Sequence, residues 1–286
     1  MADLKAFYEV IKPKQTTLLM VTCIITYLIG TRCAIDPLYF FISSFSVFLA
    51  IAGTTALNMW LDKDIDALML RTRSRPLPSG RLDEKTCAIY GLFLFSIGFF
   101  LGFFKINLLF SIILALGLFF DIIIYTVLLK RKSPYSIVLG GLAGAMPALA
   151  GWVAARGFIE LPGLIMAALV LLWIPAHIWY LTIYFEDDYR IAGIPMLPLI
   201  VGMEKTSWII VVSVGTMLIL IAVLYLVYPF SLLYLISLAF ALYFLYKAIL
   251  FAKKPSRLMA RKMYRLASWT LAGIYTSALL GSLRII

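Results

Sequence analysis

Charge is scarce in this 286-residue sequence: only 14% of the residues are charged, and the chain holds three cysteines and a single histidine. Soluble domains carry roughly a quarter charged residues, so the composition excludes an ordinary soluble protein. Cys23, Cys33 and Cys87 show no C-x-x-C spacing. The sequence therefore indicates neither a disulfide framework nor a thiolate metal site.

Apolar residues are abundant, at 63% of the chain with a mean hydropathy of +1.01. They form stretches of about twenty, the length with which an α-helix crosses a hydrocarbon core roughly 30 Å thick. These stretches do not alternate polar and apolar residues, which disfavours a membrane β-barrel. The sequence predicts an all-α, polytopic membrane protein with nine transmembrane helices. The expected spans are residues 16–35, 38–61, 87–104, 107–129, 137–156, 162–185, 207–227, 231–250 and 266–284.

Basic residues are distributed unevenly between the two sides of this arrangement. Of 25 Lys and Arg, all but Arg32, Lys105, Arg156 and Arg284 fall in the amino-terminal tail or in the loops after even-numbered spans. Such a bias places those loops and the amino terminus in the cytoplasm, in a multi-pass protein of the cell membrane. The net charge of +11 thus reports topology, and a nucleic-acid partner is not expected.

Polar sequence is concentrated in three longer connections, 62–86, 186–206 and 251–265, all on the expected cytoplasmic side. No separate soluble domain and no cleavable signal peptide is indicated. We expect residues 1–286 to form one transmembrane domain.

The first polar segment begins inside an apolar span. Asn58, Asp62 and Asp66 follow i, i+4, i+8 spacing, which places their oxygens along one stripe of a helix. Asp64 faces another direction on the helix and is a second-rank candidate for the same cluster. Oxygen donors with no nearby His or Cys favour Mg²⁺, which binds one or two carboxylates together with substrate phosphates, and disfavour zinc.

Cations follow these acids directly. Arg71 and Arg75 are four residues apart, and a Pro- and Gly-rich turn at residues 76–80 follows them. Guanidinium groups match phosphate oxygens, so a metal-holding stripe followed by arginines predicts a diphosphate site. The alternative is a solvated loop in which the acids and bases only neutralise one another.

Further polar residues occur at the ends of two later spans. Lys130 and Arg131 end one of them, in YTVLLKRK, and Asp187 and Asp188 end another, in FEDDY. The two acids are candidates for the second side of a metal-diphosphate site.

Two polar residues lie within spans, where polar groups are costly and face a cavity or the bundle interior. His177 is either functional or part of a helix–helix hydrogen bond. Asp121 has no partner that the sequence identifies.

These motifs resemble those of a known family of membrane enzymes. The N-x-x-x-D-x-x-x-D pattern of Asn58, Asp62 and Asp66 is similar to the first motif of the UbiA superfamily of intramembrane prenyltransferases. Three longer strings resemble its haem-modifying branch: DIDALMLRTRSRPLPSG, YTVLLKRKSPYSIVLGGLAGAMPALAGW and PAHIWYLTIYFEDDYRIAGIPMLP. They cover roughly residues 55 to 206.

The resemblance implies a helical bundle around a central cavity open to lipid, Mg²⁺ dependence and an allylic diphosphate as prenyl donor. In the haem-modifying branch the donor is farnesyl diphosphate and the acceptor is a vinyl group of haem b. It implies metal ligation by Asn58, Asp62, Asp66, Asp187 and Asp188. It implies catalytic roles for Asp62, Asp66, Arg71 and Lys130. It implies substrate binding by Asn58, Arg71, Arg75, Tyr125, Lys130, Arg131 and His177, the last by orienting the porphyrin or ligating its iron.

The sequence departs from the family pattern at two places. Tyr184 stands where many members carry the first acid of a second D-x-x-x-D, and Ala176 and Ile178 change the usual residues beside His177. An aromatic quinone precursor or an archaeal isoprenoid glycerol phosphate therefore stays open as acceptor. A transporter is the alternative of another class, although transporters usually bind ions near the bilayer midplane.

Overall fold

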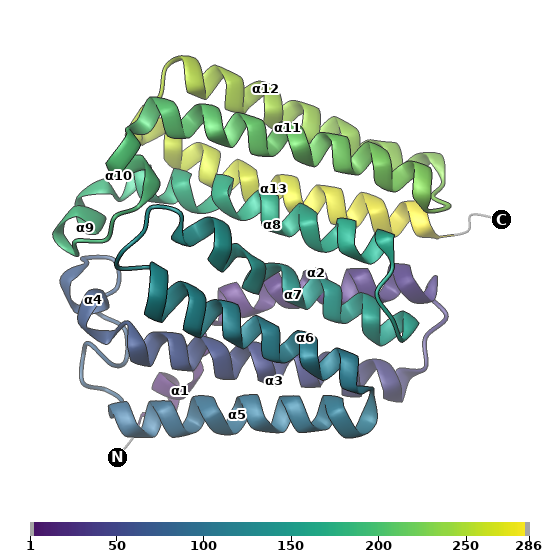
Figure 1. The fold of residues 1–286 in the computed structure, drawn as a ribbon, viewed down its shortest axis with the longest axis horizontal. Helices are drawn as coiled ribbons and strands as arrows, with labels where there is room; N and C mark the ends of the chain where they lie inside the picture. The colour runs from purple at the N-terminus through teal and green to yellow at the C-terminus, as the bar shows by residue number, and fades with distance from the viewer. Residues whose placement is uncertain (1–2, 284–286) are drawn as a thin grey trace.

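The computed structural model describes residues 3–283, and the secondary structure of this range is entirely helical (Figure 1). The predicted all-α class is confirmed. Nine long helices run side by side within the described range, and four short ones join them. The long helices are α2 (Pro13–Thr31), α3 (Pro37–Leu61), α5 (Glu84–Lys105), α6 (Leu108–Leu118) continued by η1 (Phe119–Leu129), α7 (Ser136–Arg156), α8 (Leu161–Tyr184), α11 (Met203–Val227), η2 (Leu232–Leu235) continued by α12 (Ile236–Lys253), and α13 (Arg257–Ser282). The short ones are α1 (Leu4–Val10), α4 (Lys63–Leu68), α9 (Glu186–Ile191) and α10 (Leu197–Val201). Arg284, which we counted on the non-cytoplasmic side, lies outside the described residues.

Within residues 3–283, seven of the long helices are long and apolar enough to cross a membrane, and α2 and α13 are not among them. α2 begins with Lys14 and Gln15, and the first turns of α13 carry Arg257, Arg261 and Arg265. Both helices nevertheless pack inside the bundle, α2 against α7 and α13 against α8.

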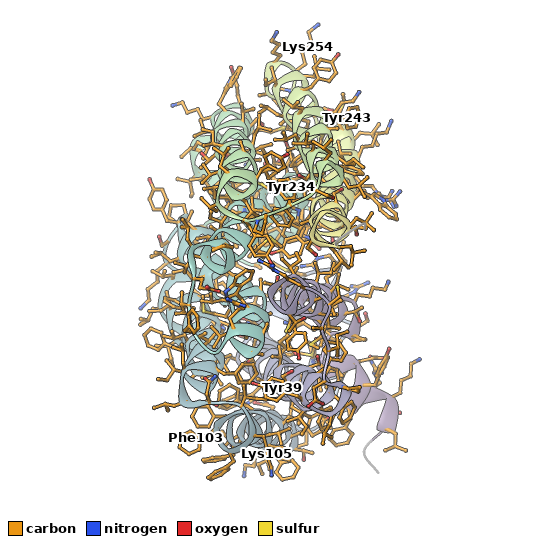
Figure 2. All side chains as sticks on the ribbon, turned by 90° about the vertical axis from the view of Figure 1, so that its right-hand side faces the viewer. Tyr39, Phe103, Lys105, Tyr234, Tyr243 and Lys254 are labelled. Carbon is orange, nitrogen blue, oxygen red and sulfur yellow. The ribbon has the colours of Figure 1, made fainter. Side chains whose placement is uncertain are left out.

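The helices differ in how much of their surface faces other helices. α3 and α7 are the most buried spans, whereas α5 and α6–η1 are the least buried. Large apolar side chains such as Phe93 and Phe104 are exposed, and Phe103 and Tyr243 point outward from the bundle (Figure 2). This apolar outer surface suits lipid, so the chain is a multi-pass membrane protein.

The short helices collect at one end of the bundle. α4, α9 and α10 lie together at the end where α3 and α8 finish (Figure 1). The polar connections 62–86 and 186–206 are therefore neighbours in space, although about a hundred residues separate them in the sequence.

The fourth span contains an unexpected change of helix type. Its second half, η1, is a π-helix, in which backbone bonds run from residue i to i+5. In a regular α-helix Asp121 and Lys130, nine residues apart, would face opposite sides, about 180° from each other. Both line the same cavity here, because the wider π-turn returns them to one face.

Candidate active site

A cavity of about 430 Å³ opens between α2, α3, α6–η1, α7 and α8. One end of it is polar and the other is apolar. The polar end is lined by Lys12, Asn58, Asp62, Asp66, Arg71, Arg75, Asp121, Tyr125 and Lys130. The apolar end is lined chiefly by Val47, Ile51, Leu114, Met146, Pro147, Trp173, Ile174, His177 and Tyr264. The structure thus brings most of the sequence-predicted site residues to one cavity.

The acidic stripe lies where α3 ends. α3 finishes at Leu61 and α4 begins at Lys63, with Asp62 as the cap between them. The backbone bonds still run from i to i−4 across this junction, from Asp62 N to Asn58 O and from Asp66 N to Asp62 O. The stripe therefore survives the interruption, and all three of its side chains are buried.

Two acids of the stripe are neutralised by cations from elsewhere in the chain. Lys130 Nζ, at the end of η1, donates to Asp62 Oδ2 at 2.5 Å, and Arg75 Nη1 donates to Asp66 Oδ2 at 2.6 Å. Asp62 Oδ1 is buried and accepts no hydrogen bond from the described residues. Buried charges need such partners, so the unused oxygen points to a ligand that supplies the missing contact.

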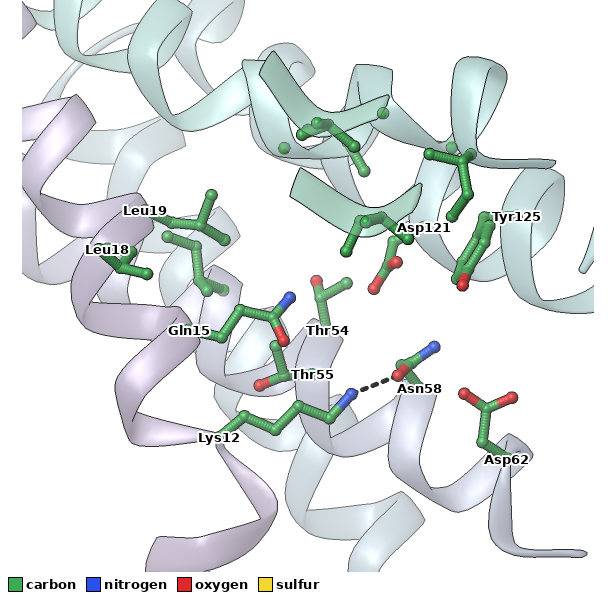
Figure 3. A pocket seen from close by; sticks show the side chains of 18 of the residues that line it. Lys12, Gln15, Leu18, Leu19, Thr54, Thr55, Asn58, Asp62, Asp121 and Tyr125 are labelled. Atoms are coloured by element: carbon green, nitrogen blue, oxygen red, sulfur yellow. Dashed lines mark hydrogen bonds between the residues drawn. The ribbon is translucent and has the colours of Figure 1, made fainter. Parts of the chain in front are cut away.

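Lys12 belongs to the site although the motifs did not identify it. It lies between α1 and α2 in the left-handed region (φ 46°), and its ammonium donates to Asn58 Oδ1 (Figure 3). Burial lowers the pKa of Lys12 to about 8, and the nearby Arg75 guanidinium adds to the shift. Lys12 is the fourth basic side chain at the polar end, beside Arg71, Arg75 and Lys130. The only sequence signal was the Lys-Pro pair that starts α2.

Arg71 and Arg75 lie in the turns after α4, and both line the cavity. The carboxylate of Asp188, in α9, accepts from Leu70 N at 3.3 Å and from Arg71 N at 3.1 Å. Asp188 thus fixes the backbone that carries Arg71, whose guanidinium lies over the Phe185 ring. Through Asp188, the acidic helix α9 therefore holds in place the turns after α4 that carry Arg71 and Arg75.

Three predicted site residues lie away from the cavity lining. Arg131 makes a two-bond pair with Asp64 on the surface, with both N···O distances at 2.6 Å. Asp187 is exposed and pairs with Arg257 at 3.0 Å. Asp188 is buried, but its two oxygens already accept backbone N–H groups. In this structure the charged groups of Arg131, Asp187 and Asp188 have protein partners outside the cavity lining, and their expected roles in substrate binding and metal ligation stay predictions.

His177 reaches the apolar end of the cavity from α8. Its ring lies between those of Trp173 and Tyr264, with centroid distances of 4.3 Å to each, and Ser268 Oγ is 3.3 Å from Nδ1. Both faces of the imidazole are covered and Nδ1 has a partner. The group that the ring can offer to a cavity ligand is Nε2.

The donors at the polar end fit Mg²⁺ better than a softer metal. They are all oxygens: the Asn58 carbonyl and the carboxylates of Asp62 and Asp66. Among the described residues no three Asp, Glu, His or Cys side chains converge closely enough to form a metal site by themselves.

A membrane-embedded helical bundle with acids and cations at one end of an apolar cavity defines an intramembrane enzyme for an anionic, lipid-tailed substrate. The sequence profile of the UbiA prenyltransferase family matches residues 19–271. The chain belongs to this family and is a prenyltransferase.

Two members of the family are similar to this chain over most of its length. The chain is 57% identical to the protoheme IX farnesyltransferase of Archaeoglobus fulgidus, over 98% of this chain and 99% of that protein. It is 46% identical to the enzyme of the same name from Korarchaeum cryptofilum, over 90% and 87% of the two chains.

Solved structures share the fold. A structure described as digeranylgeranylglyceryl phosphate synthase superimposes with a TM-score of 0.83 at 26% identity, over 100% of both chains. A UbiA homolog from Archaeoglobus fulgidus bound to GPP and Mg²⁺ gives a TM-score of 0.70 at 14% identity, over 96% of this chain and 99% of that one. The second likeness shows the fold alone.

Proposed function

We propose that the chain transfers a farnesyl group from farnesyl diphosphate to a vinyl group of haem b, and that residues 1–286 act as one prenyltransferase domain. The observation that carries the acceptor and donor is the 57% identity to a protoheme IX farnesyltransferase over nearly the whole of both chains. The cavity supports it, because one end suits a diphosphate and the other a large apolar ligand.

The polar end is assigned to the diphosphate. Asn58, Asp62 and Asp66 would hold Mg²⁺, which when bound neutralises negative charge on the diphosphate. Lys12, Arg71, Arg75 and Lys130 supply positive charge at the same place, and this stabilises the diphosphate as its bond to C1 of farnesyl breaks. Because Lys130 and Arg75 pair with Asp62 and Asp66 in this structure, ligand entry is expected to exchange those partners.

The apolar end is assigned to the prenyl chain and the acceptor. Its walls keep water from the allylic carbocation, and the aromatic rings of Trp173 and Tyr264 at this end, together with Tyr125 at the polar end, attract its charge. The terminal vinyl carbon of haem attacks C1 of the farnesyl group, and water then adds to the neighbouring carbon with loss of a proton. His177 would bind the porphyrin through Nε2. We place the polar end on the cytoplasmic side, from the distribution of basic residues.

One assay tests donor and acceptor together. Membranes that contain the protein are incubated with Mg²⁺, haem b and either farnesyl or geranylgeranyl diphosphate, and the product mass is read. We expect a mass equal to haem b plus one farnesyl group and one hydroxyl group. Prenylation of an isoprenoid glycerol phosphate or of an aromatic acid, with no change in haem, would overturn the proposed acceptor. A chelator that left the rate unchanged would overturn the metal requirement.

A further inference from the structure

Thr126 connects the π-helix to the acidic stripe without lining the cavity. Its side chain is buried, and two hydrogen bonds meet at its hydroxyl. Thr126 Oγ1 donates to the Asp121 carbonyl at 2.7 Å, and Asn58 Nδ2 donates to Thr126 Oγ1 at 2.8 Å. The hydroxyl therefore contacts Asn58, a proposed ligand of the metal, from the side opposite the expected diphosphate.

These two bonds decide which way the Asn58 amide points. A hydroxyl has one proton, and that of Thr126 is used on the Asp121 carbonyl, so towards Asn58 it can only accept. Asn58 must turn its NH₂ group to Thr126, which leaves Oδ1 on the opposite side. Lys12 imposes the same orientation independently, because an ammonium only donates and it contacts Asn58 Oδ1. The oxygen of Asn58 thus faces the place where a cation is held.

The geometry of the Thr126 hydroxyl depends on the π-turn. Thr26, Thr54 and Thr182, all in α-helices of this chain, donate to the carbonyl four residues earlier. Thr126 donates to the carbonyl five residues earlier, at Asp121. The wider turn of η1 therefore both brings Asp121 and Lys130 to one face and sets the hydroxyl against Asn58.

We propose that Thr126 is a positioning residue for the prenyl-transfer reaction: its hydroxyl, set by the π-helical turn, holds the Asn58 carbonyl oxygen towards the metal-diphosphate site. The inference rests on the proposed function, because it takes Asn58 as a ligand of Mg²⁺. Without the Thr126 acceptor only Lys12 holds the amide in this orientation, so the amide turns its NH₂ group to the cation more readily, which replaces an attractive contact with a repulsive one.

Thr126→Val tests this, because valine keeps the shape and removes both hydrogen bonds. The readout is the binding of farnesyl thiodiphosphate, an analogue that does not react, as a function of Mg²⁺ concentration. We expect Thr126→Val to raise the Mg²⁺ concentration for half-maximal binding about tenfold or more, the usual effect of losing a partner that orients a metal ligand. Thr126→Ser should restore the wild-type value. Thr182→Val is the matched control, since it removes a buried hydroxyl that lies away from the cavity, and should leave the value unchanged.

A second pair of variants shows whether Thr126 acts through Asn58. In an Asn58→Ala background, Thr126→Val should shift the Mg²⁺ dependence less than twofold further, because the residue that it orients is gone. Thr126→Ala replaces Thr126→Val if the valine variant unfolds at assay temperature, as judged by its thermal unfolding curve. A folded Thr126→Val or Thr126→Ala variant with the wild-type Mg²⁺ dependence, or a full effect in the Asn58→Ala background, would overturn the proposal.

The same measurements separate this proposal from the assignment of the acceptor. Analogue binding needs no acceptor, so a Thr126→Val shift together with unmodified haem would support the positioning role and overturn only the haem acceptor. Wild-type protein that binds the analogue equally with and without Mg²⁺ would overturn the positioning role and the metal site together.

Discussion

Asp62–Lys130 and Asp64–Arg131 link the same two segments of the chain, the junction of α3 with α4 and the end of η1. Their closest N···O distances are nearly equal, 2.5 and 2.6 Å. In the first pair the side chains are 3% and 12% exposed, and in the second 65% and 43%. An exposed pair contributes little because water and salt screen it, whereas a buried charge without its partner is costly. Helical spacing already ranks Asp62 above Asp64, but residue type and position do not distinguish Lys130 from Arg131; burial separates the site pair from the surface pair.

The largest expected effect is that of Asp62→Asn. It removes a carboxylate whose second oxygen is buried and has no partner among the described residues. We expect kcat/KM for prenyl transfer to fall roughly 1000-fold, at the upper end of what removal of one site group costs. Steady-state assay with product detection by mass measures it. Asp64→Asn is the control and should stay within about twofold of wild type; equal losses in both variants would contradict the distinction.

Lys130→Met extends the comparison to the cations. We expect a fall in kcat/KM of roughly 100-fold, because the buried ammonium at the polar end no longer stabilises the leaving diphosphate. Arg131→Met, its neighbour on the surface, should change kcat/KM by less than about threefold. A larger loss in Arg131→Met than in Lys130→Met would reverse the assignment of these two residues.

Asp187 and Asp188 form a second matched pair of buried and exposed acids. Asp188→Asn weakens the anchor of Leu70 N and Arg71 N, and we expect it to lower the free energy of unfolding by about 1–3 kcal/mol. Cleavage in residues 69–82 by limited proteolysis should quicken as the loop loosens. Asp187→Asn should do neither. If Asp188→Asn instead changed only the Mg²⁺ dependence, Asp188 would be a metal ligand after all.

The smallest effect concerns the surface pair itself. The hydrogen bond from Arg131 lowers the pKa of Asp64 below its usual range. A carboxylate with a lowered pKa stabilises the fold above its unfolded pKa near 4, and this contribution disappears as the pH falls through the lowered value. Arg131→Met should therefore cost under about 1 kcal/mol at neutral pH and nothing at the acid end. Unfolding curves at several pH values measure it, and a cost that grew at low pH would contradict this account.

The membrane fold was predictable because hydropathy over twenty residues is a local property. The site was predictable in part for the same reason: the helical spacing of Asn58, Asp62 and Asp66 fixes their common face even though α3 ends at Leu61. Lys12 and Tyr264 escaped detection because they come from helices distant in the sequence and belong to no local pattern. Residue type could not reveal that Arg131, Asp187 and Asp188 pair with Asp64, Arg257 and the backbone after α4, because those contacts come from other parts of the chain.

By itself the sequence determined that this chain is a bundle of membrane helices with its acids and cations gathered at one end. Hydropathy and charge patterns depend only on residues that are close together in the sequence. Only the tertiary structure decided which of these charges are buried and paired, that a π-turn brings Asp121 and Lys130 to the same face, and that Thr126 and Lys12 turn the oxygen of Asn58 to the cavity. These outcomes depend on contacts between helices far apart in the chain, and such contacts form only when the helices pack.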